Sequence, residues 1–143
     1  AIEVIRNTYS QCFHEWMPAV IARAEELGGW VYTLYGRPRF LPELVNGDKY
    51  QRKHAARQVI SHIVQGTAAD LLRFALFRLD AELPPEGVWM LASSHDEIIF
   101  EAAHEAAAGY VPLIVETMQL GQPLAPVPIT VDVKVAANWY DAH

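Results

Sequence analysis

Apolar residues recur at helical spacing near the start of the chain and again through a long middle segment. In the first part they are three or four positions apart: Ile2, Ile5, Tyr9 and Phe13. This spacing predicts a first helix. Pro18 suits the first turn of a second helix, which Gly28-Gly29 would end. The middle segment predicts a long helix from about residue 50 to residue 83, ended by Pro84-Pro85.

Shorter apolar stretches predict strands. Trp30–Leu34 has strand composition, and after a turn at Tyr35-Gly36-Arg37-Pro38 the segment Arg39–Leu41 is expected to pair back. Asn46-Gly47-Asp48 predicts a loop. Near the end, Ile129–Val135 alternates apolar and polar residues, which is typical of a half-buried strand.

A polar pair separates two further apolar runs. Trp89–Ala92 and Ile98–Phe100 flank His95-Asp96, which predicts a hairpin with this pair at its tip. Two-residue hairpin loops prefer Asn-Gly, Asp-Gly or Gly-X because these residues adopt positive φ easily. A tip built from a histidine and a carboxylate therefore suggests chemistry, with an ordinary polar turn as the alternative.

Together these elements predict an α+β fold, in which a small antiparallel sheet with the hairpin packs against long helices. A helix from about Ala102 to Leu120 follows the hairpin, and Pro123, Pro126 and Pro128 mark an extended connection. On the long helix the expected core stripe comprises Val64, Ala68, Leu71, Leu72, Ala75, Leu76, Leu79 and Leu83. The small residues Gly66-Thr67-Ala68-Ala69 favour close packing of this helix against the His95-Asp96 hairpin.

Composition narrows the class of protein. The chain has 143 residues, enough for one domain or part of one, and 52% apolar residues argue against disorder. No apolar run reaches the ~20 residues of a membrane span, and no cleavable targeting segment is visible. Cys12 stands alone, which fits a reducing, cytoplasmic setting. A start at Ala1 is compatible with processing or with a piece of a longer protein.

Charge is unevenly distributed along the chain. The net charge of −6 argues against nucleic-acid binding, but one segment is basic. Between positions 37 and 57 only Glu43 and Asp48 oppose six cations: Arg37, Arg39, Lys49, Arg52, Lys53 and Arg57. Phosphate contacts by Arg52, Lys53 and Arg57 are therefore expected, with a solvated basic loop as the alternative.

Several sequence blocks in a fixed order resemble the C-terminal part of the family A DNA polymerases. They are Thr33-Leu34-Tyr35-Gly36-Arg37-Pro38-Arg39-Phe40-Leu41-Pro42, Gln65-Gly66-Thr67-Ala68-Ala69-Asp70, His95-Asp96-Glu97, Val131–Val135 and Asn138-Trp139. The resemblance covers nearly the whole chain, and His95-Asp96-Glu97 resembles motif C of that family. Single-subunit RNA polymerases have a related His-Asp motif, but Glu97 is closer to the DNA enzymes. The resemblance implies the C-terminal palm segment of a DNA-directed DNA polymerase that acts in replication or repair.

The long helix also carries a polar stripe, because Arg57, Ser61 and Gln65 are four residues apart. The resemblance implies that these positions face the minor groove of primer-template DNA, where donors sense pairing geometry rather than sequence. Asn is usual in the family where this chain has Ser61, and Pro is common where it has Ile63. Gln65 has an alternative role in capping or packing near Gly66.

Nucleotidyl transfer by two Mg²⁺ ions needs bridging carboxylates, and Asp96 is the candidate metal ligand. Glu97 is adjacent and should point to the other face, so the pair cannot easily chelate together. Asp70, Asp80 and Asp132 are better explained as solvated or ion-paired. The family supplies a second Asp from an earlier palm strand and a fingers helix bearing Lys and Tyr, and neither pattern occurs here. The resemblance makes His95, Asp96 and Glu97 the catalytic residues and gives His95 a contact with the primer 3′ end.

The resemblance therefore implies half an active site that is inactive in isolation, with dNTP and primer-template DNA as partners. Either a separate N-terminal polymerase fragment completes the site, or the chain is an excised piece of a longer polymerase. Alone, the chain is expected to form homo-oligomers. The alternative is a non-catalytic DNA-binding or oligomerising module with the palm fold. Two other motifs are weaker: Glu101-x-x-His104 has the spacing of a di-iron bundle but occurs once, and Cys12 with His14 lacks an ordered third group.

Overall fold

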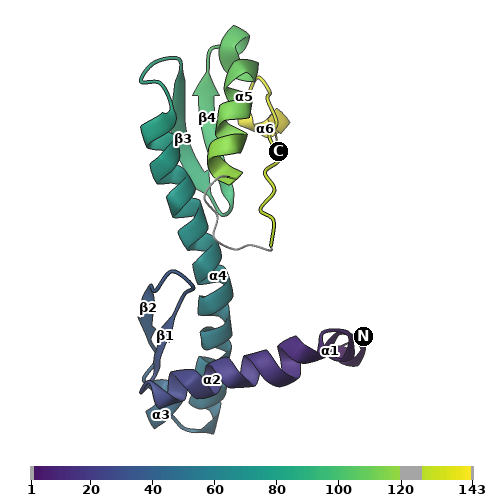
Figure 1. Cartoon of the computed structure of the whole chain (residues 1–143), viewed down its shortest axis with the longest axis vertical. Coiled ribbons are helices and arrows are strands. Elements are labelled where there is room, and N and C mark those ends of the chain that lie inside the picture. Colours follow the sequence, from purple (N-terminus) through teal and green to yellow (C-terminus); the bar gives the residue numbers. More distant parts are fainter. Residues whose placement is uncertain (1, 120–126, 143) are drawn as a thin grey trace. The chain divides into compact units, whose positions relative to one another are not determined.

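The computed structural model describes residues 2–119 and 127–142. The chain forms two compact units, unit 1 (Ala1–Ala68) and unit 2 (Ala69–His143). Helix α4 (Lys49–Glu82) runs unbroken through Gly66 and contributes its first part to unit 1 and its second part to unit 2 (Figure 1). This helix confirms the expected long middle helix to within one residue at each end.

Unit 1 begins with three consecutive helical segments: α1 (Ile2–Thr8), the π-helix η1 (Gln11–Trp16) and α2 (Met17–Glu26). Pro18 lies in the first turn of α2, and positive φ angles at Gly28 and Gly29 reverse the chain after it. At Gly29 a Cβ atom would lie 2.7 Å from the carbonyl oxygen of Leu41, so only glycine fits this close approach. The chain then enters β1 (Trp30–Tyr32).

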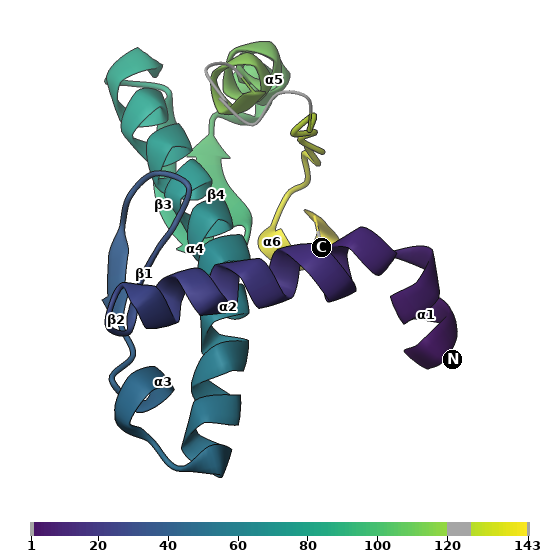
Figure 2. The same cartoon turned by 60° about the horizontal axis from the view of Figure 1, so that its bottom comes forward.

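Strand β1 pairs antiparallel with β2 (Pro38–Phe40), one residue earlier than the expected return strand, and α3 (Glu43–Asn46) follows. The core of unit 1 lies between α2, this ribbon, α3 and α4. It consists of Ala24, Val31, Leu41, Leu44, Ala55 and Val59. Figure 2 shows α2 crossing the first part of α4, which places the buried side chains of both helices against one another.

Polar contacts attach the β1–β2 ribbon to α4. The Leu34 amide donates to Thr67 Oγ1 at 3.1 Å, and Arg37 Nη2 donates to the Gly66 carbonyl at 2.8 Å. Buried His62 donates from Nε2 to the Arg37 carbonyl at 3.1 Å. A Cβ atom on Gly66 would lie 2.8 Å from Thr33 Cγ2, so the helix approaches the ribbon too closely for any larger residue. Close packing at Gly66 is therefore against the Trp30–Phe40 ribbon.

Unit 2 contains the end of α4, β3 (Val88–Ser94), β4 (Glu97–Ala102), α5 (His104–Gln119) and the short α6 (Trp139–Ala142). Its buried apolar side chains come from α4, β3 and α5: Ala75, Leu79, Val88 and Ile114. Buried Thr117 donates its hydroxyl to Glu82 Oε2, which ties α5 to the end of α4. Strands β3 and β4 confirm the expected hairpin, and α5 starts two residues later than expected.

The β3–β4 ladder contains one irregularity. Met90 pairs with Phe100 and Ala92 pairs with Ile99, so Leu91 is an extra residue in β3. Such a bulge increases local twist while the pairing continues beyond it. Beyond the bulge the pairs run to Ser94 and Glu97, where the turn begins.

Two sequence expectations, a strand at 129–135 and a core position for Val64 and Ala68, differ from the structure. Residues 129–135 form no strand, because neither β3 nor β4 pairs with them and an extended segment needs a partner ladder. Val64 and Ala68 are exposed rather than core residues, since the side of α4 buried in unit 1 passes through Ala55 and Val59. The short helix α3 was not expected. Leu120, Pro123 and Pro126 lie outside the described residues.

No helix within residues 2–119 or 127–142 has both the length and the apolar character that crossing a bilayer requires.

Candidate functional site

His95 and Asp96 form the complete two-residue loop of the β3–β4 hairpin, because Ser94 and Glu97 are the last paired residues. Both loop residues are exposed. His95 has φ +54°, and it is the one non-glycine residue with positive φ in the described part of the chain. A side chain in this left-handed conformation costs free energy that glycine avoids, so the tip departs from the usual residue choice for such loops.

The tip presents a carboxylate with access to solvent. Mg²⁺ prefers oxygen ligands and commonly takes one or two carboxylates, completing its shell with waters and phosphates. Asp96 fits this role as one contributing ligand. In the parts of the chain that the structure describes, no three His, Cys, Asp or Glu side chains gather into a metal-binding group. A Mg²⁺ ion at Asp96 therefore needs additional ligands.

The carboxylates considered beside Asp96 lie in different settings. Glu97 is half-buried at the start of β4. Asp70 is buried on α4 with Arg73 Nη1 at 3.4 Å, in line with an ion-paired role. Asp80 and Asp132 are exposed, and Asp132 lies in the segment that forms no strand. Of these groups, Asp96 alone lies at the tip of the hairpin.

The polar stripe on α4 lies wholly within unit 1. Arg57 and Gln65 are exposed, and Ser61 between them is half-buried. Ser61 Oγ donates to Gln65 Oε1 at 2.9 Å across one helical turn. Gly66, next to Gln65, is held to the β1–β2 ribbon by Arg37 at its carbonyl, so this turn of the helix has a fixed support.

The basic residues at the start of α4 differ in what they contact. Arg52 donates from Nη2 to the Val45 carbonyl at 2.6 Å and from Nε to the Gly47 carbonyl at 2.9 Å. These bonds satisfy carbonyls at the end of α3 and commit much of the guanidinium to the fold. Lys53 lies beside Arg52 in the sequence and is exposed, as is Arg57 one turn further on.

A polar chain that the sequence interpretation missed joins the ribbon to α4. Arg39 Nη2 donates to Gln58 Oε1 at 2.8 Å, and Gln58 Nε2 donates to His54 Nε2 at 2.6 Å. The spacing of four residues between His54 and Gln58 was the available signal. Arg37, which also belongs to the basic segment, is instead directed to the Gly66 carbonyl. Part of the basic segment therefore secures unit 1.

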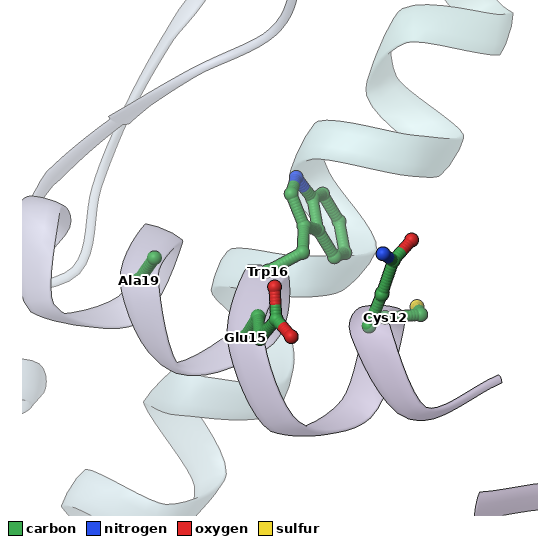
Figure 3. A pocket seen from close by; sticks show the side chains of 5 residues that line it. Cys12, Glu15, Trp16 and Ala19 are labelled. Carbon is green, nitrogen blue, oxygen red and sulfur yellow. The ribbon is translucent and has the colours of Figure 1, made fainter. Parts of the chain in front are cut away.

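A surface hollow follows η1 and the beginning of α2 (Figure 3). Its lining residues are Gln11, Cys12, Glu15, Trp16 and Ala19. His14 is not among them, so this hollow does not combine the two members of the Cys12–His14 pair. Glu101 is exposed on β4 and His104 begins α5, and among the described residues they belong to no cluster of three or more His, Cys, Asp or Glu side chains, which a di-iron site would need.

One carboxyl group in unit 2 has a shifted pKa. The hydrogen bond from Thr117, together with Arg78 one turn away on α4, lowers the pKa of Glu82 below its ordinary value. Arg78 Nη2 lies 3.1 Å from Glu82 Oε1. Glu82 thus connects the end of α4 to α5 in its ionised form.

Comparison with known proteins assigns the chain to a family. A model of DNA polymerase family A matches residues 2–141. This match covers almost the whole chain, in agreement with the resemblance of its motifs. The chain belongs to DNA polymerase family A.

Individual relatives agree with this assignment. The chain is 36% identical to the thermostable DNA polymerase I of Thermus filiformis over 143 residues, a match covering 98% of the chain and 17% of that protein. It is 40% identical to the Thermus aquaticus enzyme over 114 residues, or 80% of the chain and 14% of that protein. The chain therefore spans less than a fifth of the length of these relatives.

A solved structure supports the fold. The polymerase domain of Pol1 from M. smegmatis, solved with DNA primer-template and dNTP, matches with a TM-score of 0.68 and 29% identity. The match covers 78% of this chain and 20% of that one. The α+β, palm-like architecture expected from the sequence is thus confirmed.

Proposed function

We propose that this chain is the C-terminal palm part of a DNA-directed DNA polymerase that carries out template-dependent nucleotidyl transfer. The main support is the hairpin tip. A family A match over residues 2–141 includes a two-residue loop whose carboxylate, Asp96, is exposed, and whose His95 holds an unfavourable φ. A turn selected only for stability would use glycine there.

Asp96 binds Mg²⁺ in this proposal, and Glu97, half-buried beside the tip, is a second catalytic residue with a smaller contribution because it points to the other face. When bound, Mg²⁺ polarises phosphoryl oxygens and neutralises developing charge. His95 lies at the tip with Asp96 and contacts the primer 3′ end. Because Asp96 is the single carboxylate at the tip, the second metal-bridging carboxylate and the groups that hold dNTP come from polymerase segments beyond these 143 residues, either on a separate N-terminal chain or on a longer protein of which this chain is a piece.

Unit 1 carries the proposed DNA contacts. Exposed Lys53 and Arg57 contact phosphates and the groove, and Gln65 contacts the minor groove near the primer terminus. Arg52 adds a phosphate contact through the guanidinium edge that faces away from the Val45 and Gly47 carbonyls. Ser61 is shorter than an amide side chain and lies half-buried, so its own reach into the groove is limited.

Without the N-terminal fragment the chain forms homo-oligomers. The N-terminal helices expose apolar side chains that a partner would cover: Val4, Ile5, Tyr9 and Trp16. Contiguous apolar patches of this kind drive self-association. Light scattering over a concentration series tests this, and a strict monomer at high concentration contradicts it.

Primer extension with and without an N-terminal fragment of a family A polymerase tests the main proposal. We expect no incorporation by the purified chain alone, and template-dependent incorporation after the two parts are combined. Incorporation by the chain alone would contradict the half-site assignment. Binding of duplex without any incorporation in the combined sample would favour the non-catalytic DNA-binding module instead.

A further inference from the structure

Ser61 and Gln65 form a hydrogen bond that fixes how the Gln65 amide is presented. The Ser61 hydroxyl donates to Gln65 Oε1 at 2.9 Å. A carboxamide has one acceptor oxygen and one NH₂ donor group. With the oxygen turned toward Ser61, the NH₂ group of this exposed side chain is directed away from the hydroxyl and remains available to a ligand.

The direction of the amide matters for a reader of the minor groove. Every base pair shows acceptors there, adenine N3 or thymine O2 and their counterparts in G·C pairs, whereas only guanine adds a donor. An NH₂ group can therefore contact any correctly paired step. An amide oxygen would face acceptors at most positions and would be repelled. Arg57 carries donors only, so it needs no such orientation.

We propose that Ser61 acts as a positioning residue, which holds the Gln65 amide with its NH₂ group toward the groove acceptor at the primer terminus. This inference rests on the proposed polymerase function. Its supports are the Ser61–Gln65 bond, the partial burial of Ser61 and the anchoring of the adjacent Gly66 by Arg37. The role of Ser61 in this proposal is its hydrogen bond to Gln65 rather than its own limited reach into the groove.

Primer extension by the complemented enzyme provides the first test. Ser61→Ala should lower the efficiency of extension from a paired terminus by about three- to tenfold, the scale of one lost hydrogen bond. Ser61→Thr keeps the hydroxyl and should retain most of the efficiency. Val64→Ala, at an exposed neighbouring position, is the matched control and should have no effect. Equal losses from Ser61→Thr and Ser61→Ala would overturn the proposal.

A change in the DNA separates positioning from general damage to the helix. A 3-deazapurine at the primer terminus replaces the N3 acceptor by C–H. Wild type should lose efficiency on this primer, and Ser61→Ala should cause little further loss. If Ser61→Ala costs the same factor on both primers, Ser61 does not act through the groove contact of Gln65.

NMR of the Gln65 side-chain NH₂ tests the inference without catalysis. In wild type the NH₂ group should be more ordered than in Ser61→Ala, and its signals should shift when primer-template duplex is added. The shift should be smaller with the 3-deazapurine duplex. Identical Gln65 mobility in both proteins, or identical shifts with both duplexes, would overturn the proposal. Failure of every variant to extend primers would count against the polymerase function, while this measurement still decides the role of Ser61.

Discussion

The two units carry formal charges of opposite sign, and the roles proposed for them differ accordingly. Unit 1 has eight Lys and Arg against six Asp and Glu, a formal charge of +2, whereas unit 2 has three against eleven, a charge of −8. The polar stripe that we assign to DNA lies in unit 1 and the proposed metal ligand in unit 2. An acidic surface repels phosphates unless bound cations neutralise it. The net charge of the whole chain, −6, does not reveal that one unit is basic and the other acidic.

The two hairpins differ in the residue that adopts positive φ at the turn. The turn of the β1–β2 ribbon uses Gly36 at φ +82°, where only geometry is required. The β3–β4 turn uses His95 at φ +54°, where glycine would serve the backbone better. The proposed role of His95 at the primer terminus accounts for this departure from glycine at the second turn.

Replacing Asp96 should have the largest effect. In the complemented enzyme Asp96→Asn should lower activity by about a hundredfold or more, because a metal site stabilises transition-state charge by several kcal/mol. Thermal stability should stay nearly unchanged or rise slightly, since exposed functional groups often oppose stability. Primer extension and calorimetry measure the two quantities.

Glu97→Gln serves as the comparison for Asp96→Asn. Glu97 is half-buried and paired with Ser94, so its loss should reduce activity less. Equal activity losses, or unfolding of Asp96→Asn, would contradict the roles assigned to the tip.

The two units also differ in how much space surrounds a glycine within a helix, Gly66 in α4 and Gly109 in α5. At Gly66 a Cβ atom would press on buried Thr33, whereas at Gly109 in α5 it would meet nothing within 4 Å. Overpacking costs about 1–3 kcal/mol and helix propensity returns about 1 kcal/mol. Gly66→Ala should therefore lower the free energy of unfolding by up to about 2 kcal/mol, and Gly109→Ala should raise it by about 0.5–1 kcal/mol. Urea titration measures both, and stabilisation by Gly66→Ala would refute the close approach of α4 to the ribbon.

Replacing the positive-φ residue in each turn compares the two hairpins directly. His95→Gly should raise the free energy of unfolding by about 0.5–1 kcal/mol by relieving positive φ, while reducing primer extension in the complemented enzyme. Gly36→Ala should destabilise by about 1 kcal/mol. Thermal unfolding provides the measurement. A destabilising His95→Gly would mean that the histidine side chain holds the turn.

Salt dependence tests the contrast in charge. Lys53→Ala should weaken duplex binding for all sequences and reduce the slope of log affinity against log salt by about one, the contribution of one phosphate contact. The matched control is Lys134→Ala in unit 2, which should leave the slope unchanged. Fluorescence anisotropy between low and moderate salt measures it. An unchanged slope in Lys53→Ala would remove Lys53 from the DNA contacts.

The smallest expected effect is on how the free energy of unfolding depends on pH through Glu82 in unit 2. The folded-state pKa of Glu82 is lowered, so its stabilisation is complete above the unfolded pKa and is lost as pH falls through the folded pKa. Thr117→Val removes the hydrogen bond that contributes most to this shift. The stability difference between wild type and Thr117→Val should shrink as pH falls from 7 to about 3. Urea titrations at several pH values test this, and a constant difference would show that packing alone is affected.

Local sequence signals were sufficient for part of the fold. Helical spacing and Pro84-Pro85 located α4, and the apolar runs around His95-Asp96 located the hairpin to the residue. Alternation in 129–135 was misleading, because pairing depends on a partner strand that a local pattern cannot reveal. Val64 and Ala68 fit the spacing of a core stripe, yet α4 turns another side to the core of unit 1. That choice depends on α2 and β1, which are distant in sequence.

The sequence located the candidate residues in their elements but did not reveal their side-chain contacts. The unusual turn composition singled out His95 and Asp96 as candidate site residues. The spacing of four residues predicted the polar stripe of Arg57, Ser61 and Gln65 on α4. The engagement of Arg52 with α3 carbonyls and of Arg37 with Gly66 could not be foreseen, because a basic residue has the same appearance in sequence whether it contacts backbone or solvent. The Ser61–Gln65 bond was compatible with the spacing but needed the side-chain geometry.

The extra residue in β3 has a consequence for how the hairpin accommodates changes of chain length. Leu91 lies outside the pairing, with Met90–Phe100 on one side and Ala92–Ile99 on the other. An insertion or deletion at this point leaves the pairs on both sides able to form. In β4 the residues pair without interruption, so losing one would turn every following side chain to the opposite face. Length variation can therefore accumulate in one strand of the hairpin while the other strand keeps the register of the tip.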